Sequence, residues 1–475
     1  MCIRDRIAGT RIASRPAWSV LDFVERMRRE ETRLRLLVAG DLAVETAFAL
    51  SYDDLDPETA ALFRALAVIE GATFDARIAA AALAADVLDT EARLDELTDL
   101  GLLEARGGNR YRLHDLLRLF AGSRLRRDDG AEGETDRRTR LRSWLLASLE
   151  RAGAWFEPGR VPESAGPSGM SFPDQETAHA WIQLEVAHWW PALRSAAARG
   201  EHDVVVDVAD ALHWFSDLWL GWAHWNELFS LSAGAARALG DPLLEATHLG
   251  YVAWTEIIER GSNEAALATS GQALAAADAA DDDGQRGWAH FYAGWAAMNL
   301  ERFEEGADHA RAAVQAFGSA EDPEGTAQAF MLAARVQRNR GEHEGALREF
   351  RTILAQAEDG ARRSRSPVMQ ITAASAREFI VLSLAALERW PEAIVEADEL
   401  LLLAQTLGAH SRVVSALDLR AKAKLESGDR AGALRDIDEA LSGGEVPHDS
   451  YLGDLRRALE RMREDALAGA GGRGE

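Results

Sequence analysis

The stretches GSNEAAL (261–267), RFEEGA (302–307) and EHEGAL (342–347) decide the fold of this 475-residue chain. In each stretch, acidic or polar residues lead into a small residue at the start of an amphipathic helix. These small residues, called the markers below, are Ala266, Gly306, Ala346, Ala393 and Ala433, with spacings of 40, 40, 47 and 40 residues. Leu228 begins the series less clearly. A fixed period in this range predicts stacked helical hairpins, which place more than half of the chain in a binding surface.

Composition limits the class of protein. The chain is 47% hydrophobic, which supports a folded core, and its net charge of −25 argues against nonspecific nucleic-acid binding by the whole chain. Cys2 is the only cysteine, so no internal disulfide can form and a cytosolic setting fits. We find no apolar stretch of membrane-spanning length and no signal peptide, and therefore expect a cytoplasmic protein.

Signatures of catalysis are missing from the sequence. The two lysines, Lys422 and Lys424, both follow alanine, so the Gly-Lys pair of a phosphate-binding loop does not occur. The chain also has no H-E-x-x-H motif, no G-x-S-x-G motif and no Cys/His set with metal-ligand spacing. We expect no catalytic residue and no metal site, and a hydrolase is the least favoured class of function.

Residues 51–127 predict a compact unit of helices and one hairpin. Asp56-Pro57-Glu58 starts a helix, because proline suits the first helical position and an acid suits the first turn. Asp75 and Asp89 are expected to start two further helices, and a last helix is expected near Asp115. Gly107-Gly108-Asn109 lies between two short apolar segments and predicts a β-hairpin. This order predicts a winged-helix unit.

The remaining segments complete a mostly all-α fold, in which the winged-helix unit is followed by an α-solenoid. Residues 7–50 read as helices, and 128–174 as a charged linker with a connecting helix. Residues 175–466 are expected to form the hairpins, with a break at 359–367, and 467–475 a disordered tail. Residues 1–6 look like translated sequencing-adaptor sequence, so the true N-terminus is expected to be missing. The bias toward arginine and alanine points to an actinobacterial genome.

Three motifs carry a family resemblance over roughly residues 8–470. They are FALSY (48–52), RYRLHDL (110–116) and FPD (172–174), followed by Ala180-Trp181 and Glu185. Together they resemble NB-ARC transcriptional regulators of the STAND class, in particular the actinomycete antibiotic-regulatory type. In that family an effector domain precedes a nucleotide-binding domain, a helical subdomain, a winged helix and tetratricopeptide repeats. The resemblance implies that 7–50 is a remnant of the helical subdomain and that ADP or ATP binds the full-length protein, for which slow ATPase activity is allowed.

His114 is the one cofactor-binding residue that the resemblance implies. Leu113-His114-Asp115 matches the family's Met-His-Asp motif with leucine in place of methionine. By that resemblance, His114 contacts the β-phosphate of ADP and holds the closed state, while Asp115 caps the next helix or orients the turn. An imidazole N–H can donate to a phosphate oxygen. Taken alone, a His-Asp pair after a strand is more often structural.

The winged-helix unit raises the alternative of DNA binding. The helix expected over 89–100 carries an acidic face with Glu91, Asp95, Glu96 and Asp99, which would repel phosphate. We therefore expect no direct nucleic-acid contact by this chain.

The repeats predict a partner-binding groove. Tetratricopeptide repeats place small residues where the two helices of a hairpin approach closely, and the first helices line the concave side. Counting back from the markers gives His213, Asp217, His248, Tyr251, Thr255, Trp288, Phe291, Trp295, Asn299, Arg335, Arg338 and Asn339. Aromatic rings beside Asn and Arg suit a protein or peptide ligand, with a small-molecule signal as the alternative. For each residue taken singly, packing in the core between repeats is favoured over ligand contact, except that for Arg335 and Arg338 the two interpretations are balanced.

Tryptophan and arginine are each clustered in the sequence. Trp214, Trp219, Trp222 and Trp225 crowd one region with Trp189 and Trp190, which predicts the packed entry to the solenoid rather than a ligand pocket. Arginine clusters are mostly flanked by acids and read as solvated helix ends, although the cluster at 362–365 could form a contact loop.

The favoured function is an N-terminally truncated, signal-responsive transcriptional regulator of the STAND class. Its repeats would bind a protein or ligand signal, and its winged helix would be the lid of a nucleotide switch. The alternative is a stand-alone repeat scaffold that assembles other proteins and never meets a nucleotide. An upstream phosphate-binding loop would distinguish the two.

Overall fold

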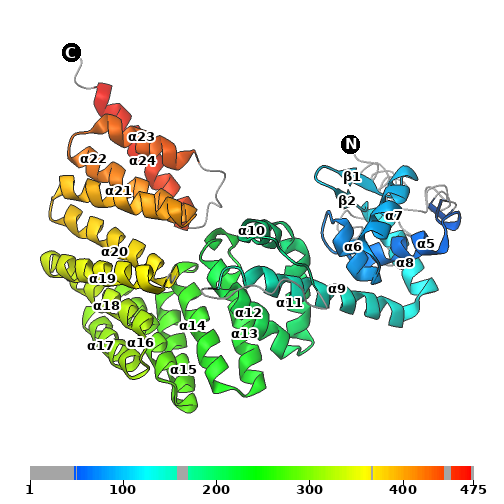
Figure 1. The fold of residues 1–475 in the computed structure, drawn as a ribbon, viewed down its shortest axis with the longest axis horizontal. Coiled ribbons are helices and arrows are strands. Elements are labelled where there is room, and N and C mark those ends of the chain that lie inside the picture. The colour runs from blue at the N-terminus through cyan, green and yellow to red at the C-terminus, as the bar shows by residue number, and fades with distance from the viewer. Residues whose placement is uncertain (1–47, 50, 158–168, 365–366, 443–450, 472–475) are drawn as a thin grey trace, which may run out of the picture. The chain divides into compact units, whose positions relative to one another are not determined.

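The computed structural model describes residues 48–49, 51–157, 169–364, 367–442 and 451–471. It divides into two compact units (Figure 1). The first contains residues up to Ala152 together with Glu163–Ala196, and the second contains Gly153–Pro162 and Ala197–Glu475. The predicted helices before residue 48 and the adaptor-like residues 1–6 lie outside the described residues.

The first unit begins with short helices and a two-stranded hairpin. Its elements are α5 (Pro57–Ala65), the 3-10 helix η1 (Leu66–Val68), α6 (Ala76–Leu83), α7 (Val87–Asp99), β1 (Glu104–Arg106), β2 (Arg110–Arg112) and α8 (Asp115–Asp128). The strands pair antiparallel, with Ala105 opposite Tyr111, and Phe74 adds an antiparallel bridge to Tyr111. This is the element order predicted for a winged-helix unit.

Side-chain caps explain where these helices begin. Asp56 accepts hydrogen bonds from the amides of Glu58 and Thr59, and Asp75 accepts one from the amide of Ile78. The third helix begins at Val87 because Asp86 caps it, so Asp89 lies inside the first turn and is not the cap predicted from the sequence. An aspartate in either place suits a helix N-terminus, and the backbone geometry decides between them.

The segment expected to be a linker is largely helical. Helix α9 runs over Gly130–Gly153, so residues 130–140 are helical and not an irregular linker. Helices α10 (Gln175–Leu184) and α11 (Val186–Ala198) follow. Both group almost entirely with the first unit, whereas the sequence placed them at the start of the solenoid.

The second unit is a series of helical hairpins (Figure 1). Its elements are α12 (His202–Ser216), η2 (Leu220–Trp222), α13 (Trp225–Leu239), α14 (Pro242–Ile258), α15 (Asn263–Ala280), α16 (Asp283–Asn299), α17 (Phe303–Ser319), α18 (Pro323–Asn339), α19 (His343–Ser364), α20 (Pro367–Ala386), α21 (Trp390–Thr406), α22 (His410–Glu426), α23 (Arg430–Leu441) and α24 (Tyr451–Gly471). Each marker lies in the second helix of a hairpin and is buried. The α-solenoid is therefore as predicted.

Close backbone approach explains why the markers are small. A Cβ added to Gly306 would lie 3.3 Å from the carbonyl oxygen of Gly294 on the paired helix. The residue five positions before every marker has a positive φ, and these residues are Gly261, Glu301, Gly341, Glu388 and Gly428. The turns between the two helices of these hairpins thus share a positive φ at the same position relative to the marker, which sets where the second helix begins.

Longer helices explain the single spacing of 47 residues. Helices α19 and α20 contain 22 and 20 residues, whereas α16, α17 and α18 each contain 17. Helix α19 continues to Ser364, so most of the break predicted at 359–367 is helical. The C-terminal helix also continues to Gly471, which overturns the disordered tail predicted for 467–471.

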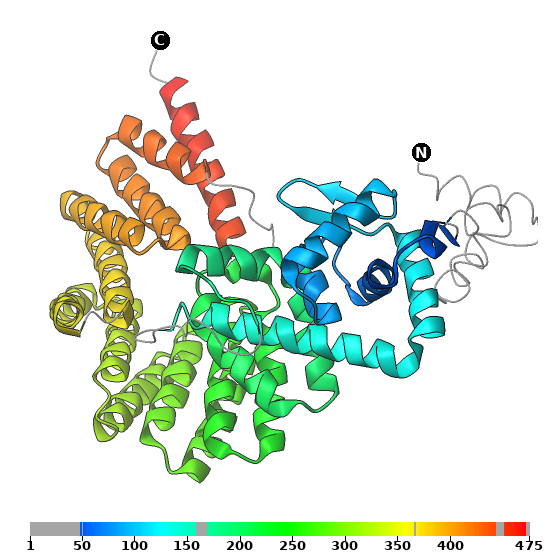
Figure 2. The ribbon, with the colours of Figure 1, turned by 45° about the vertical axis from the view of Figure 1, so that its right-hand side comes forward.

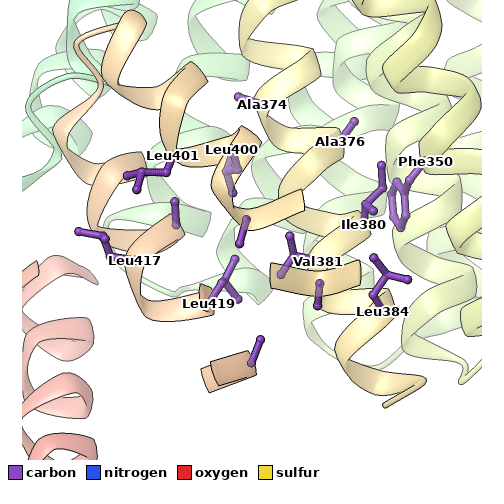
Figure 3. Close-up of a cluster of buried hydrophobic side chains, with 14 of the residues drawn as sticks. Phe350, Ala374, Ala376, Ile380, Val381, Leu384, Leu400, Leu401, Leu417 and Leu419 are labelled. Carbon is purple, nitrogen blue, oxygen red and sulfur yellow. The ribbon is translucent and has the colours of Figure 1, made fainter. Parts of the chain in front are cut away.

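The hydrophobic core of the second unit runs between successive helices. Figure 3 shows side chains of α19, α20, α21 and α22 converging, among them Phe350, Ile380, Leu400 and Leu417. None of the helices in the described part of the chain is long and apolar enough to cross a membrane.

The first helices of the hairpins lie next to one another along one face. Helix α14 contacts α16, α16 contacts α18, and the series continues through α20 and α22 to α24. The unit follows a curved path (Figure 2), and α24 comes back into contact with η2 near the start of the series. We call the face built by α12, α14, α16, α18, α20 and α22 the inner face.

Candidate functional site

His114 is the N-cap of α8. Its Nδ1 accepts a hydrogen bond from the amide of Leu116 at 3.3 Å, so His114 takes the capping role that the sequence gave to Asp115. Because Nδ1 accepts, a neutral imidazole must carry its proton on Nε2. The ring is half-buried, and Nε2 has no hydrogen-bond partner among the described residues. The geometry leaves one N–H donor available on His114.

A buried polar junction holds α10 and α11 against the helix–hairpin part of the first unit. Arg110 forms a two-pronged ion pair with Glu185, whose side chain is 1% exposed, and Arg110 Nη2 lies 3.0 Å from Glu185 Oε2. The same guanidinium donates to the carbonyl and hydroxyl oxygens of Thr73. The hydrogen bond to Glu185, together with the negative charges of Glu185 and Asp75, raises the pKa of Arg110. Sequence reasoning missed this ion pair.

His188 completes the junction. Its Nδ1 accepts from the amide of Gly71 at 3.3 Å, and its Nε2 lies 2.9 Å from the carbonyl oxygen of Thr73. Burial lowers the pKa of His188, so the neutral tautomer with a proton on Nε2 fits both contacts. Gly71 is required there, because an added Cβ would lie 2.1 Å from Cε1 of the imidazole.

The inner face begins with a cluster of titratable groups on α12 and α14. His213 stacks on Tyr251 with ring centroids 4.0 Å apart, and the Tyr251 hydroxyl donates to Asp210 at 3.3 Å. Burial raises the pKa of Asp210 to about 6 and lowers that of His248 to about 4. At pH 7 His248 is therefore neutral, and its 3.5 Å contact with Asp210 is not an ion pair.

Several residues predicted on the groove are part of the core. His248, Thr255 and Phe291 are buried, and the Thr255 hydroxyl accepts a hydrogen bond from Asn226 at 2.9 Å. The partly buried Trp288 packs against Phe317, with ring centroids 5.2 Å apart. These side chains hold successive hairpins together, which is the alternative interpretation of the sequence pattern.

Two predicted amides lie at the ends of their helices. Asn299 is exposed and donates to Asn263 at 2.9 Å. Asn339 is also exposed, and its Oδ1 accepts a hydrogen bond from Arg338 at 2.8 Å. Both amides are thus already engaged by neighbours within the repeats.

Arg335 and Arg338 are predicted groove residues that form no ion pair with any described residue. The Arg335 guanidinium lies over two rings, with Cζ 4.7 Å from the centroid of Trp295 and 4.9 Å from that of Phe379. No described residue forms a hydrogen bond or ion pair with Arg335. Arg338 lies over Phe379 at 5.7 Å, and its buried Nε has no hydrogen-bond partner. Burial, together with the charge of Arg338, lowers the pKa of Arg335 to about 10.

Helices α20 and α22 contribute residues that the sequence did not single out. Glu378 accepts a hydrogen bond from Ser415 and lies 3.8 Å from Arg412. Burial raises the pKa of Asp217, which follows α12. The positive charge of nearby Arg412 partly offsets this shift. Counting would have found Glu378, because it precedes Ala393 by the same fifteen residues that separate Tyr251 from Ala266.

A shallow pocket of about 330 Å³ lies between α19, α20 and α21. Arg362, from the arginine cluster at 362–365, is in its lining together with Arg377. Arg377 forms ion pairs at 2.7 Å with both Glu358 and Glu396, so its charge is neutralised. Arg362 is exposed, so neither arginine of this pocket is a partly buried, unpaired cation like Arg335.

The tryptophan-rich region separates into two groups. Trp219, Trp222 and Trp225 pack against one another in the second unit, and the Trp225 indole donates to the carbonyl oxygen of Trp219. Trp189 and Trp190 contact each other in the first unit. Both groups are packed aromatic side chains.

Three carboxylates of the acidic face of α7 accept hydrogen bonds within their own unit. Tyr111 donates to Asp95, Asn109 donates to Glu91, and Thr59 donates to Glu96. Among the described residues no group of three or more His, Cys, Asp or Glu side chains could hold a metal ion.

Comparison with known proteins gives related regulators. The chain is 29% identical over 351 residues to the regulatory protein AfsR of Streptomyces coelicolor, an alignment that covers 71% of this chain and 34% of AfsR. It is 30% identical over 351 residues to AfsR of Streptomyces griseus, covering 72% of this chain and 36% of that protein. The chain thus spans about a third of the length of these curated relatives. No family model matches it.

Solved structures with similar helical architecture are more distant. A STAND protein with a tetratricopeptide-repeat sensor from Pyrococcus horikoshii has a TM-score of 0.40 and 13% identity, covering 98% of this chain and 71% of that one. A Rap protein complexed with competence and sporulation factor has a TM-score of 0.44 and 13% identity, covering 69% and 87%. At TM-scores of this size the likeness says nothing about ligands or mechanism. The sequence identity, however, confirms the resemblance noted above: the chain is a relative of the actinomycete regulatory proteins of the AfsR type.

Proposed function

We propose that this chain is the sensor part of a cytoplasmic, STAND-class transcriptional regulator. The inner face of its repeats binds a protein or peptide signal, and the unit over 51–127 acts as the winged-helix lid of a nucleotide switch. The observation that carries the proposal is the identity of about 30% to the AfsR regulatory proteins over 351 residues. The chain itself carries no catalytic role in this scheme.

The geometry of His114 supports the lid role. In the full-length protein, ADP would occupy a nucleotide-binding domain that precedes the described residues. The available Nε2–H of His114 would donate to its β-phosphate, a charge-assisted hydrogen bond that stabilises the closed state. A signal bound more tightly to the open state then shifts the population toward it, because differential affinity is the source of such a switch.

The test separates phosphate contact from helix capping at His114. In the full-length protein, His114→Ala removes both functions, whereas His114→Ser removes the imidazole and keeps a good N-cap. We expect both variants to raise basal transcription of a reporter, by roughly tenfold if one hydrogen bond to a charged group is lost. A serine variant that behaves like the parent would mean that His114 only caps α8.

A second measurement distinguishes the regulator from a stand-alone repeat scaffold. Sequencing of genomic DNA upstream of codon 7 should reveal an in-frame Gly-Lys-Ser/Thr loop within the preceding few hundred codons. A stop codon and ribosome-binding site immediately upstream would exclude the nucleotide switch. The favoured function would then be a stand-alone scaffold that binds other proteins through its inner face.

A further inference from the structure

An unpaired guanidinium group on the inner face indicates a specific ligand chemistry. Arg335 contacts the aromatic rings of Trp295 and Phe379, and these contacts satisfy none of its five N–H donors. The rings come from α16 and α20, which flank α18 on the inner face, so they hold the guanidinium in place at the middle of that face. A guanidinium that is fixed and lacks an acceptor is prepared to receive one from outside the chain.

Arg338 lies one helical turn further along α18 and strengthens the argument. Its Nη2 donates only to the neutral amide of the adjacent Asn339, and its Nε is buried without a partner. The carboxylate that affects both arginines is Glu378, which is also hydrogen-bonded to Ser415 and 3.8 Å from Arg412. With Asp217, which lies near Arg412, the cluster has two carboxylates against the three positive charges of Arg335, Arg338 and Arg412.

Other arginines of the second unit show that this lack of pairing is local. Arg377 has two carboxylate partners, Glu358 and Glu396, and Arg420 likewise pairs with Asp398 and Asp436. The whole chain has a net charge of −25, so acidic side chains are abundant. Arg335 and Arg338 therefore differ from Arg377 and Arg420 in having no carboxylate of their own.

We propose that Arg335 and Arg338 bind a carboxylate of an acidic peptide segment on the signal protein. This proposal rests on the proposed function and adds the chemistry of the ligand. Arginine forks match the two oxygens of a carboxylate, and two neighbouring forks can bind one or two acidic groups. The inner face continues from α18 to Tyr251 on one side and Ser415 on the other, which suits an extended chain more than a single small ion.

The experiment measures peptide binding to the intact chain. Fluorescein-labelled hexaglutamate with an amidated C-terminus is titrated with protein and followed by fluorescence anisotropy, with hexaglutamine as the neutral comparison. Because a chain of charge −25 repels an anionic peptide at long range, nonspecific attraction does not imitate the site. We expect measurable binding of hexaglutamate, much weaker binding of hexaglutamine, and loss of affinity as salt concentration rises.

Variants identify the residues responsible. Arg335→Gln and Arg338→Gln should each weaken hexaglutamate binding at least about tenfold, and Arg335→Lys should give an intermediate loss because it keeps charge without the fork. Arg311→Gln is the matched control, because Arg311 lies on α17, a second helix, and pairs with the exposed Asp308. It should leave the affinity unchanged. Circular dichroism of each variant verifies that the solenoid remains folded.

Three results would overturn the proposal. They are no binding of hexaglutamate by the parent chain, equal binding by the parent and Arg335→Gln, and equal loss of binding in Arg311→Gln. Inorganic phosphate is a further arm: arginine-dependent phosphate binding without hexaglutamate binding would identify a site for small anions instead. If the peptide-binding proposal fails, the proposed nucleotide switch is not affected, because the switch is tested by transcription with the His114 variants. If the nucleotide switch fails, the measured peptide affinity does not change.

Discussion

Arg110 in the first unit and Arg335 in the second are both partly buried arginines that touch neighbouring elements, yet they face opposite surroundings. Arg110 meets the carboxylate of Glu185 and the oxygens of Thr73, and its pKa is raised. Arg335 meets two aromatic rings and a second arginine, and burial lowers its pKa to about 10. A folded chain that leaves a guanidinium unsatisfied carries an electrostatic cost, which a ligand can relieve.

The difference separates residues that hold the fold from residues that can bind a ligand. Breaking a buried ion pair leaves an isolated charge and is strongly destabilising, whereas replacing a charge that has no partner removes a cost. Removing a charge should therefore lower the free energy of unfolding more at the Arg110–Glu185 ion pair of the first unit than at Arg335 of the second unit. Stability measurements on both units can test this directly.

The largest effect is expected from Glu185→Gln. The substitution keeps the shape of the side chain but leaves the Arg110 guanidinium without a counter-charge, which should lower the free energy of unfolding of the first unit by about 3 kcal/mol. Hydrogen exchange of the backbone amides of residues 104–128 in the full chain measures this loss. Exchange in α18 and α20 should not change.

Glu176→Gln is the control for the charge change. Glu176 lies in the first turn of the same helix pair and is exposed, so its loss should cost only a few tenths of a kcal/mol. If Glu185→Gln were as mild as Glu176→Gln, the junction would not hold the first unit together.

A smaller loss is expected from Gly71→Ala. The new methyl group would overlap the imidazole of His188, which must move and lose its bond to the Gly71 amide. Overpacking of this kind costs about 1–3 kcal/mol. Gly107→Ala is the control, because nothing lies within 4 Å of a Cβ at that position. Thermal unfolding of the two variants should differ, and equal midpoints would mean that the contact adds no stability.

The periodic parts of the structure could be predicted from the sequence, and the junction could not. The markers follow the repeat because every hairpin needs a small residue at its closest approach, so one period fixes many helices. Arg110 and Glu185 are 75 positions apart, and Gly71 and His188 are 117 apart. No local pattern connects residues at such separations, and the ion pair arises only when the two segments pack.

The candidate site was predictable where the period held. Counting back from the markers reached Trp295, Arg335 and Arg338, but it was not applied from Ala393, so Glu378 and Phe379 on α20 were missed. Counting could not separate ligand contacts from core either, since Thr255 and Trp295 occupy the same position eleven residues before a marker. Thr255 is buried and Trp295 is partly exposed, and this difference depends on which side chains surround each residue in the folded chain.

The smallest effect is expected from Arg335→Met, and it is the sharpest test of the comparison. Methionine can cover Trp295 and Phe379 while removing the desolvated charge and its repulsion with Arg338. Losing the cation–π contacts costs about 0.5–1 kcal/mol each, and relief of the desolvated charge offsets this loss. Urea unfolding of the second unit should therefore stay within about 1 kcal/mol of the parent. A loss near that of Glu185→Gln would show that Arg335 is a structural residue like Arg110, and the case for a carboxylate site would lose its physical basis.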